Sequence, residues 1–139
     1  MEEVEFHDGL DPGLIAELME LFEGEWWTEG RERADVERML TGSDMVISAT
    51  ERKGGTLVGV IRAITDGVYA ATILDVIVAP DWRSQGLGVA LMEHAHKHPV
   101  LAGCRRIGLI CVEGMVPFYE RFGYELAPPD HLRMIRRSP

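Results

Sequence analysis

The stretch from residue 70 to residue 79 constrains the fold of this chain more than any other feature. Its sequence is Ala-Ala-Thr-Ile-Leu-Asp-Val-Ile-Val-Ala, which is almost entirely apolar. We expect it to form a strand that is buried on both faces, because a strand with one wet face alternates apolar and polar side chains. Pro80 follows and ends the strand. The pattern therefore predicts a sheet with helices on both sides.

The order of the other predicted elements fits such a sheet. Asp11 and Pro12 indicate a helix start, and Asp66-Gly67 indicates a hairpin turn into the central strand. Hydrophobic spacing gives the remaining elements. We predict strands over 4–7, 44–52, 56–65, 106–112 and 132–136, and helices over about 12–22, 31–40, 86–97 and 116–121. This order predicts an α+β fold with three layers, α/β/α, in a single domain spanning residues 1–139.

Composition sets limits on location and membrane association. The chain is 46% hydrophobic and 27% charged, and no apolar run reaches the roughly 18 residues that a transmembrane helix needs. The acidic N-terminus does not resemble a signal peptide. Cys104 and Cys111 have no metal-ligand partners at usable spacing. We therefore expect a cytoplasmic protein with reduced thiols, no metal and no membrane partner.

The charge of the chain is unevenly placed. Residues 1–30 hold ten acidic side chains and no Lys or Arg, whereas the remaining residues hold 13 acids and 14 bases. An acidic segment repels phosphate backbones, which argues against a nucleic-acid partner, and it attracts a cationic substrate such as an amine. The alternative is an acidic face that only keeps the protein solvated.

The residues that most clearly indicate a ligand site lie in the turn after the central strand, Arg83-Ser84-Gln85-Gly86-Leu87-Gly88. Glycines there let the backbone turn sharply toward a ligand, and the first amides of the following helix form an anion site suited to phosphate. The sequence does not contain the nucleotide-triphosphate loop Gly-x-x-x-x-Gly-Lys-Ser/Thr. It does not match the dinucleotide fingerprint Gly-x-Gly-x-x-Gly or Ala either, because the last position of that pattern, counted from Gly86, falls on Leu91. On its own the motif also fits a turn that merely permits tight packing.

Two segments resemble the signatures of the GNAT superfamily of N-acetyltransferases. Residues 75–92 are similar to its acetyl-CoA-binding segment, and residues 118–124, Phe-Tyr-Glu-Arg-Phe-Gly-Tyr, are similar to its second signature. The resemblance covers roughly residues 44–127. It implies a mostly antiparallel mixed sheet that is splayed at the acetyl-CoA site.

The resemblance also implies which residues hold acetyl-CoA. The main chain of the splayed strand would pair with the pantetheine arm at Val76, Ile77 and Val78. The pyrophosphate would lie on the amides of the loop, with the side chain of Arg83 or Gln85 beside it. The loop residues implied are Arg83, Ser84, Gln85, Gly86, Leu87, Gly88 and Val89.

Tyr119 matches the residue that protonates the leaving thiolate in this superfamily. For the base we expect Asp75, the only ionisable residue in its strand, because burial raises the pKa of a carboxyl group. The alternative is that Asp75 pairs with Arg62, and Glu113, acting through water, is a second candidate base. The superfamily's common Asn before the tyrosine helix is missing, which puts that contact to acetyl-CoA in doubt.

The acceptor pocket is expected at the first two helices, their connection and the hairpin before the central strand. We place Trp26, Trp27, Arg31 and Tyr69 there, since an aromatic wall near acidic side chains suits an ammonium group. Ordinary core packing of at least one tryptophan is the alternative.

These features together predict direct transfer of an acetyl group from acetyl-CoA to a small-molecule amine. A protein N-terminus or lysine is the rival acceptor, and a non-catalytic acetyl-CoA-binding protein is the rival from another class. His94, His96 and His98 do not make a metal site, because helical spacing aligns only two of them. A homodimer is left open.

Overall fold

The five strands of the protein form one sheet in the order β1-β2-β3-β4-β5. A computed structural model describes residues 1–139, and it falls into two compact units, Met1–Leu109 and Ile110–Pro139. The whole sheet belongs to the first unit. Its strands pair antiparallel, except that β4 and β5 are parallel. The predicted α+β fold with a mostly antiparallel mixed sheet is confirmed.

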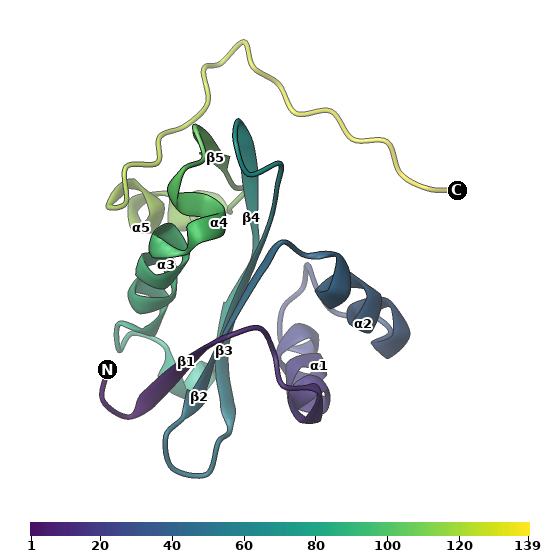
Figure 1. Cartoon of the computed structure of the whole chain (residues 1–139). Helices are drawn as coiled ribbons and strands as arrows, with labels where there is room; N and C mark the ends of the chain where they lie inside the picture. The colour runs from purple at the N-terminus through teal and green to yellow at the C-terminus, as the bar shows by residue number, and fades with distance from the viewer. The chain divides into compact units, whose positions relative to one another are not determined.

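The first unit follows the predicted order of elements closely. Its strands are β1 (Val4–Asp8), β2 (Met45–Glu51), β3 (Leu57–Thr65), β4 (Ala70–Val78) and β5 (Arg106–Gly108). Its helices are η1 (Pro12–Leu14), α1 (Ile15–Glu23), α2 (Arg33–Gly42), η2 (Pro80–Trp82), α3 (Leu87–Lys97) and α4 (Pro99–Ala102). Figure 1 shows α1 and α2 on one side of the sheet and α3 and α4 on the other.

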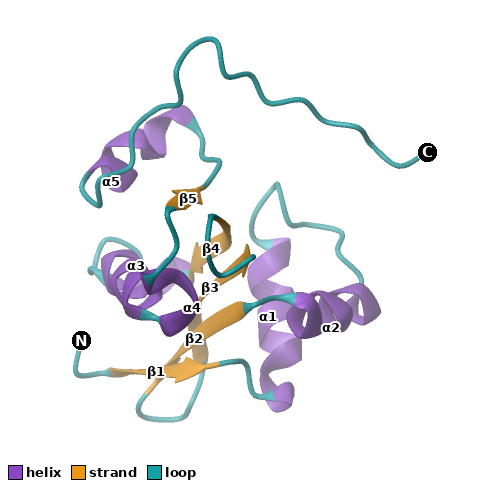
Figure 2. Ribbon diagram, turned by 45° about the horizontal axis from the view of Figure 1, so that its top comes forward, coloured by secondary structure: helices purple, strands orange, loops and turns teal.

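The core on the α1 side is made by helix side chains that pack against the middle strands. Leu18 and Phe22 of α1 and Val36 of α2 join Val60 of β3 and Ile77 of β4 in one buried cluster. Figure 2 shows both helices beside the sheet. Because these three helix residues are at most 1% exposed, the cluster fixes where the connection between α1 and α2 can run.

On the other face, α3 approaches β3 closely at Gly59. A Cβ atom at this position would lie 3.1 Å from a methyl group of Leu91 and 3.4 Å from one of Leu87. The missing side chain therefore lets α3 lie against the strand. This contact places the first half of α3 beside the start of β3 and the end of β4.

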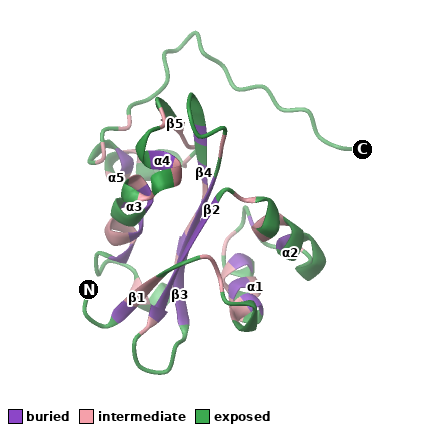
Figure 3. Cartoon of the chain, viewed as in Figure 1, coloured by how far each residue is buried: buried purple, intermediate pink, exposed green.

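The strand that is buried throughout is β3, not β4. The first seven residues of β3 are buried, whereas in β4 buried residues alternate with half-buried or exposed ones, as the colours of Figure 3 show. The expectation that residues 70–79 are buried on both faces is therefore wrong. Position explains the difference, since β3 is the middle strand of the five, and β5 pairs with only three residues of β4.

The second unit contains η3 (Glu113–Met115) and α5 (Val116–Glu120). Residues 125–139 form no helix or strand, so the strand predicted over 132–136 is absent. Leu132 and Met134 are 82% and 93% exposed, and the segment has no strand partner that would satisfy its main chain. The strand predicted over 106–112 ends at Gly108. That the two units form a single domain stays a prediction.

Leu18 provides a test of the core on the α1 side. Leu18→Ala is expected to lower the free energy of unfolding by about 2–5 kcal/mol, because it leaves a cavity in a closely packed cluster. Urea denaturation measures this difference. Leu132→Ala is the matched control at an exposed position and should change the free energy by no more than about 0.5 kcal/mol. Equal effects of the two substitutions would contradict the packing described here.

Candidate functional site

The edge of β4 that faces away from β3 is paired over only part of its length. Strand β5 pairs with the first three residues of β4 alone, so β4 has no strand partner on this edge after Thr72. The amide of Ala79 donates to the carbonyl of Val58 at 2.8 Å and therefore faces β3. Because the main-chain groups of successive strand residues point to opposite sides, those of Val78 and Val76 face the open edge.

Ile77 differs from its two neighbours. It pairs with Val60 of β3, and its side chain is 2% exposed in the core. Its main-chain groups are therefore already used within the sheet. The expectation that Val76, Ile77 and Val78 all offer their main chain to a ligand is wrong for Ile77, because the groups of a strand alternate in direction.

A β-bulge interrupts β4 at Asp75. The register between β3 and β4 shifts between Val60 and Arg62, so that two residues of β4 oppose one residue of β3. Asp75 has a φ of 54°, in the left-handed region that few residues other than glycine, asparagine and aspartate adopt. The bulge therefore re-aims β4 just where its outer edge is open.

The turn from β4 into α3 leaves a row of amides without partners. Ser84 and Gly86 both have positive φ values, 61° and 87°, and no side chain caps α3. The first helical bond is donated by Ala90 to the carbonyl of Gly86 at 3.0 Å. The amides of the six residues before Ala90 donate to no group of the protein: Ser84, Gln85, Gly86, Leu87, Gly88 and Val89.

Such a row of amides at a helix start is an anion site. The N–H groups carry partial positive charge, and the helix dipole adds to it. A loop in which right-handed and left-handed residues alternate also turns successive N–H groups inward. The geometry therefore supports the predicted phosphate-binding role of residues 84–89.

The side chains of Arg83 and Gln85 in this loop are turned back onto the protein. Arg83 donates from Nε to the carbonyl of Val78 at 3.1 Å and from a terminal nitrogen to Oε1 of Glu25 at 2.7 Å. Gln85 donates to the carbonyl of Asp81 at 2.8 Å. The side chains of Arg83 and Glu25 are 51% and 17% exposed. With the guanidinium this exposed, the ion pair is weak enough for an incoming phosphate to replace Glu25. From the sequence, Glu25 was expected among the acids near the tryptophans that suit an ammonium group, and nothing in the sequence indicated its pairing with Arg83.

Both carboxylate oxygens of Asp75 accept hydrogen bonds from arginines. Oδ2 lies 2.6 Å from Nε of Arg62 and 2.8 Å from a terminal nitrogen of Arg31, whose other terminal nitrogen lies 3.1 Å from Oδ1. Burial by itself raises the pKa of Asp75, but the hydrogen bonds and charges of the two arginines outweigh burial. The pKa of Asp75 is therefore held below its usual range.

The arrangement corrects the role expected of Asp75. The expectation that its pKa is raised is wrong, and the alternative, an ion pair with Arg62, is confirmed. A carboxylate with a lowered pKa and both oxygens occupied is a poor proton acceptor. The structure therefore does not support Asp75 as the general base.

The connection between α1 and α2, residues 24–32, carries Trp26 and Trp27 on its surface. They are 71% and 45% exposed and meet edge to face, with their ring centroids 5.8 Å apart. Thr28 takes the buried position instead, and its hydroxyl donates to the carbonyl of Phe22 at 2.7 Å. Core packing of a tryptophan is therefore excluded, because a threonine that bonds the end of α1 fills that place.

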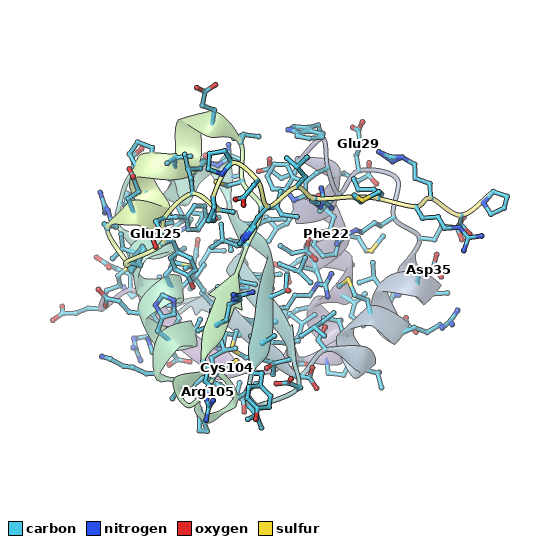
Figure 4. All side chains as sticks on the ribbon, turned by 90° about the horizontal axis from the view of Figure 1, so that it is seen from above. Phe22, Glu29, Asp35, Cys104, Arg105 and Glu125 are labelled. Atoms are coloured by element: carbon cyan, nitrogen blue, oxygen red, sulfur yellow. The ribbon has the colours of Figure 1, made fainter.

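Arg31 and Tyr69 lie apart from each other. Arg31 ends the same connection as the tryptophans, and its guanidinium carbon lies 4.7 Å from the centre of the Phe22 ring. Tyr69 precedes β4, at the end of the strand opposite to the loop of residues 83–88, and the Arg105 guanidinium lies over its ring at 5.0 Å. Figure 4 shows Phe22 among the inner side chains, with Arg105 at a distant edge. Three of the four predicted acceptor residues thus lie on one connection, and Tyr69 lies apart from it.

Tyr119 lies on α5 in the second unit. It is 8% exposed, and its ring meets the edges of Phe118 and Tyr124 at centroid distances of 5.0 and 6.2 Å. Burial, with a smaller contribution from Cys111, raises the pKa of Tyr119 to about 12. The phenol therefore stays protonated at neutral pH, which is the state that a proton donor requires.

The histidines do not form a metal site. His94 stacks on Phe6 at a centroid distance of 4.0 Å, and Nε2 of His98 lies 3.1 Å from a carboxylate oxygen of Asp8. No group of three or more His, Cys, Asp or Glu side chains lies close enough together to hold a metal ion. No helix of the chain combines the length and apolar character that crossing a membrane requires.

Comparison with known proteins gives a consistent result. The model of the Acetyltransferase (GNAT) family matches residues 14–124. The uncharacterized N-acetyltransferase ycf52 of Porphyra purpurea is 30% identical over 86% of this chain and 68% of its own length. GCN5-related N-acetyltransferase 2, chloroplastic, of Arabidopsis thaliana is 38% identical over 52% of this chain. The chain spans only 28% of the length of that relative.

The comparison with solved structures agrees with the family match. A candidate acetyltransferase of Deinococcus radiodurans R1 is 31% identical, with 94% of this chain and 88% of that one covered and a TM-score of 0.77. The fold predicted from the sequence is therefore also the fold of solved relatives.

The paired state of Asp75 makes stability depend on pH. Asp75→Asn is expected to lower the free energy of unfolding by about 3–5 kcal/mol at neutral pH, because the buried Arg62 and the half-buried Arg31 lose their carboxylate. The folded-state pKa of Asp75 lies below its unfolded value. Its stabilisation is therefore complete above the unfolded pKa of about 3.9 and is lost as the pH falls through the folded pKa.

Urea denaturation of both proteins over a pH series measures this effect. The difference between them should stay constant at neutral pH and shrink below about pH 4. Asp35→Asn, at an exposed position on α2, is the control and should have little effect at any pH. A difference for Asp75→Asn that does not change at low pH would contradict the ion-pair account.

Proposed function

Because the chain belongs to the acetyltransferase (GNAT) family, we propose that it transfers the acetyl group of acetyl-CoA directly to a primary amine of a small molecule. The row of unpartnered amides of residues 84–89 beside the open edge of β4 carries this proposal. A bond forms between the amine nitrogen and the acetyl carbon, and the carbon–sulfur bond of the thioester breaks. The amine loses one proton, and the sulfur of CoA gains one.

Acetyl-CoA would be held mainly by main-chain groups. The pyrophosphate would accept from the amides of residues 84–89, and Arg83 would exchange Glu25 for a phosphate oxygen. The amide groups of the pantetheine arm would pair with the outward main chain of Val76 and with the amide of Val78, since the carbonyl of Val78 already accepts from Arg83. Half-buried strand groups without partners are unfavourable, so a peptide-like ligand that satisfies them binds well.

Two groups would assist the chemical step on the donor side. A main-chain amide near Val78 would polarise the acetyl carbonyl, in the way that fixed donors stabilise developing negative charge. Tyr119 would give its proton to the departing sulfur. The support for Tyr119 is its place in the segment 118–124 and a pKa of about 12, which keeps the phenol protonated.

The acceptor must lose a proton before it attacks. An alkyl amine with a pKa near 10 is neutral in only about one molecule in 10³ at pH 7, so the rate should rise with pH. The paired state of Asp75 leaves Glu113, acting through water, as the base that the sequence offers. Trp26 and Trp27 would hold the ammonium form by cation–π attraction near the acidic side chain of Glu29.

A second acceptor class has an observation in its favour. Trp26 and Trp27 lie on an exposed connection rather than in a closed cavity, so the lysine or N-terminus of another protein would also reach them. Competition between a small-molecule amine and a lysine peptide in the same assay separates the two classes. A cytoplasmic location, a homodimer and the lack of nucleic-acid and membrane partners stay predictions.

Thiol release from acetyl-CoA with a panel of amines tests the proposed function. We expect release with at least one amine and a roughly 10²–10⁴-fold lower kcat for Tyr119→Phe, because the sulfur loses its proton donor. The affinity for acetyl-CoA, measured by calorimetry, should not change. Tyr124→Phe is the matched control and should keep most of the turnover.

Two results would contradict the proposal. Full turnover by Tyr119→Phe would remove the role assigned to this tyrosine. Tight acetyl-CoA binding without thiol release by any amine or peptide would favour a non-catalytic acetyl-CoA-binding protein.

A further inference from the structure

Arg31 binds Asp75 in a way that fixes the position of both residues. Its two terminal nitrogens lie 2.8 and 3.1 Å from the two carboxylate oxygens, and the Phe22 ring supports the guanidinium plane at 4.7 Å. Paired parallel bonds and stacking restrict the rotation of an arginine far more than a single contact does. The Asp75 side chain is only 4% exposed. Arg31 therefore holds the end of the α1–α2 connection at one fixed point of β4.

The same carboxylate also reaches β3 and the end of α2. Arg62 of β3 donates from Nε to Asp75 and from a terminal nitrogen to the hydroxyl of Ser43 at 3.4 Å. The Ser43 hydroxyl donates in turn to the carbonyl of Met39 at 2.8 Å. Asp75 thus joins the connection, β3, β4 and, through Arg62, the C-terminal end of α2. A shift of Arg31 would leave Asp75 paired with Arg62 alone and its buried Oδ1 without a hydrogen bond.

The conformation of Asp75 ties these contacts to the open edge of β4. Its φ of 54° belongs to the bulge, and a conformation of this kind persists only where surrounding contacts enforce it. Val76, whose main chain faces the open edge, is the next residue along the bulge. The bond from Arg31 therefore fixes the position of the connection relative to the bulge.

The second ion pair of the connection, between Glu25 and Arg83, is weaker than the pair between Arg31 and Asp75. Glu25 meets Arg83 through a single bond of 2.7 Å, and the Arg83 side chain is 51% exposed. The Arg31 side chain is 28% exposed and its partner 4%. A ligand phosphate would compete for Arg83 but would not reach the buried carboxylate of Asp75. Trp26 and Trp27 lie between these two points in the chain. Thr28 ties the connection to the end of α1 through its bond to the carbonyl of Phe22, and Arg31 is the residue that ties it firmly to β4.

We propose that Arg31, acting through Asp75, is a positioning residue that holds the Trp26–Trp27 connection in register with the bulge of β4 and so places the acceptor amine against the acetyl group. The proposal rests on the proposed function. Arg31 then does not bind the acceptor itself, although the sequence predicted it in the acceptor pocket. Its loss should affect the acceptor side of the reaction and leave the binding of acetyl-CoA intact.

Three variants test the proposal. Arg31→Met removes the charge and both bonds, Arg31→Lys keeps the charge but loses the paired geometry, and Arg33→Met is the control, since Arg33 makes an exposed pair with Glu37 on α2. The measurements are kcat and KM for the best amine of the panel, the Kd of acetyl-CoA by calorimetry, and hydrogen exchange of the amides of Thr28 and Glu29. Hydrogen exchange reports the fastening of the connection without any need for turnover.

We expect Arg31→Met to lower kcat/KM for the amine by about 10–100-fold, because a displacement of about 1 Å misaligns the reacting groups. The Kd of acetyl-CoA should stay at the wild-type value, and exchange at Thr28 and Glu29 should be faster. Arg31→Lys should recover part of kcat/KM and, because it keeps a charge beside Asp75, it also serves if Arg31→Met does not fold. Arg33→Met should match the wild type in every measurement.

Several outcomes would overturn the proposal. Kinetics of Arg31→Met and Arg31→Lys that match Arg33→Met would show that Arg31 does not position the acceptor. Unchanged hydrogen exchange would show that Arg31 does not fasten the connection, and an equal loss of acetyl-CoA affinity would show a general structural role. If the wild-type chain releases no thiol with any amine, the proposed function fails and the proposal fails with it, whatever the exchange shows.

Discussion

One buried carboxylate, shared by two arginines, organises the part of the structure on which function depends. Asp75 lies on the bulge of β4, and its oxygens receive Arg62 from the neighbouring strand and Arg31 from the connection between α1 and α2. A buried ion cluster does not stabilise a fold more than apolar packing would. Its effect is on geometry, because neither arginine can move without breaking a hydrogen bond to the shared carboxylate. The bulge, the exposed tryptophans and the end of α2 are therefore held in one arrangement.

The donor side depends on the opposite condition, namely polar groups that have no partner in the protein. Strand β5 leaves β4 after three residue pairs, and α3 begins without a side-chain cap. Unpaired main-chain groups reduce stability, and a ligand that carries amides and phosphates recovers this loss. Rigid positioning on the acceptor side and unsatisfied main chain on the donor side meet along β4, which is why this strand carries both halves of the candidate site.

The sequence predicted those features of the fold and of the site that depend on residues close together in the chain. The glycines at 86 and 88 after a strand indicated the amide row, and hydrophobic spacing indicated the order of helices and strands. The partners of Asp75 lie 13 and 44 residues away in the chain, so its lowered pKa could not be read from an apolar strand alone. The exposure of Trp26 and Trp27 could not be predicted from the sequence either, because only the folded connection shows that Thr28 fills the buried position. The segment 132–136 has strand-like composition but no partner strand.

The most direct test of the account is an NMR titration of the 15N-labelled chain with acetyl-CoA. The account predicts that the amide signals of Ser84–Val89 and of Val76 and Val78 shift together and saturate at one stoichiometric equivalent. The amide of Ile77, which pairs within the sheet, should move less than those of its neighbours. Signals of residues 84–89 that stay unmoved while acetyl-CoA is turned over, or shifts confined to another face of the sheet, would contradict the assignment of the donor site.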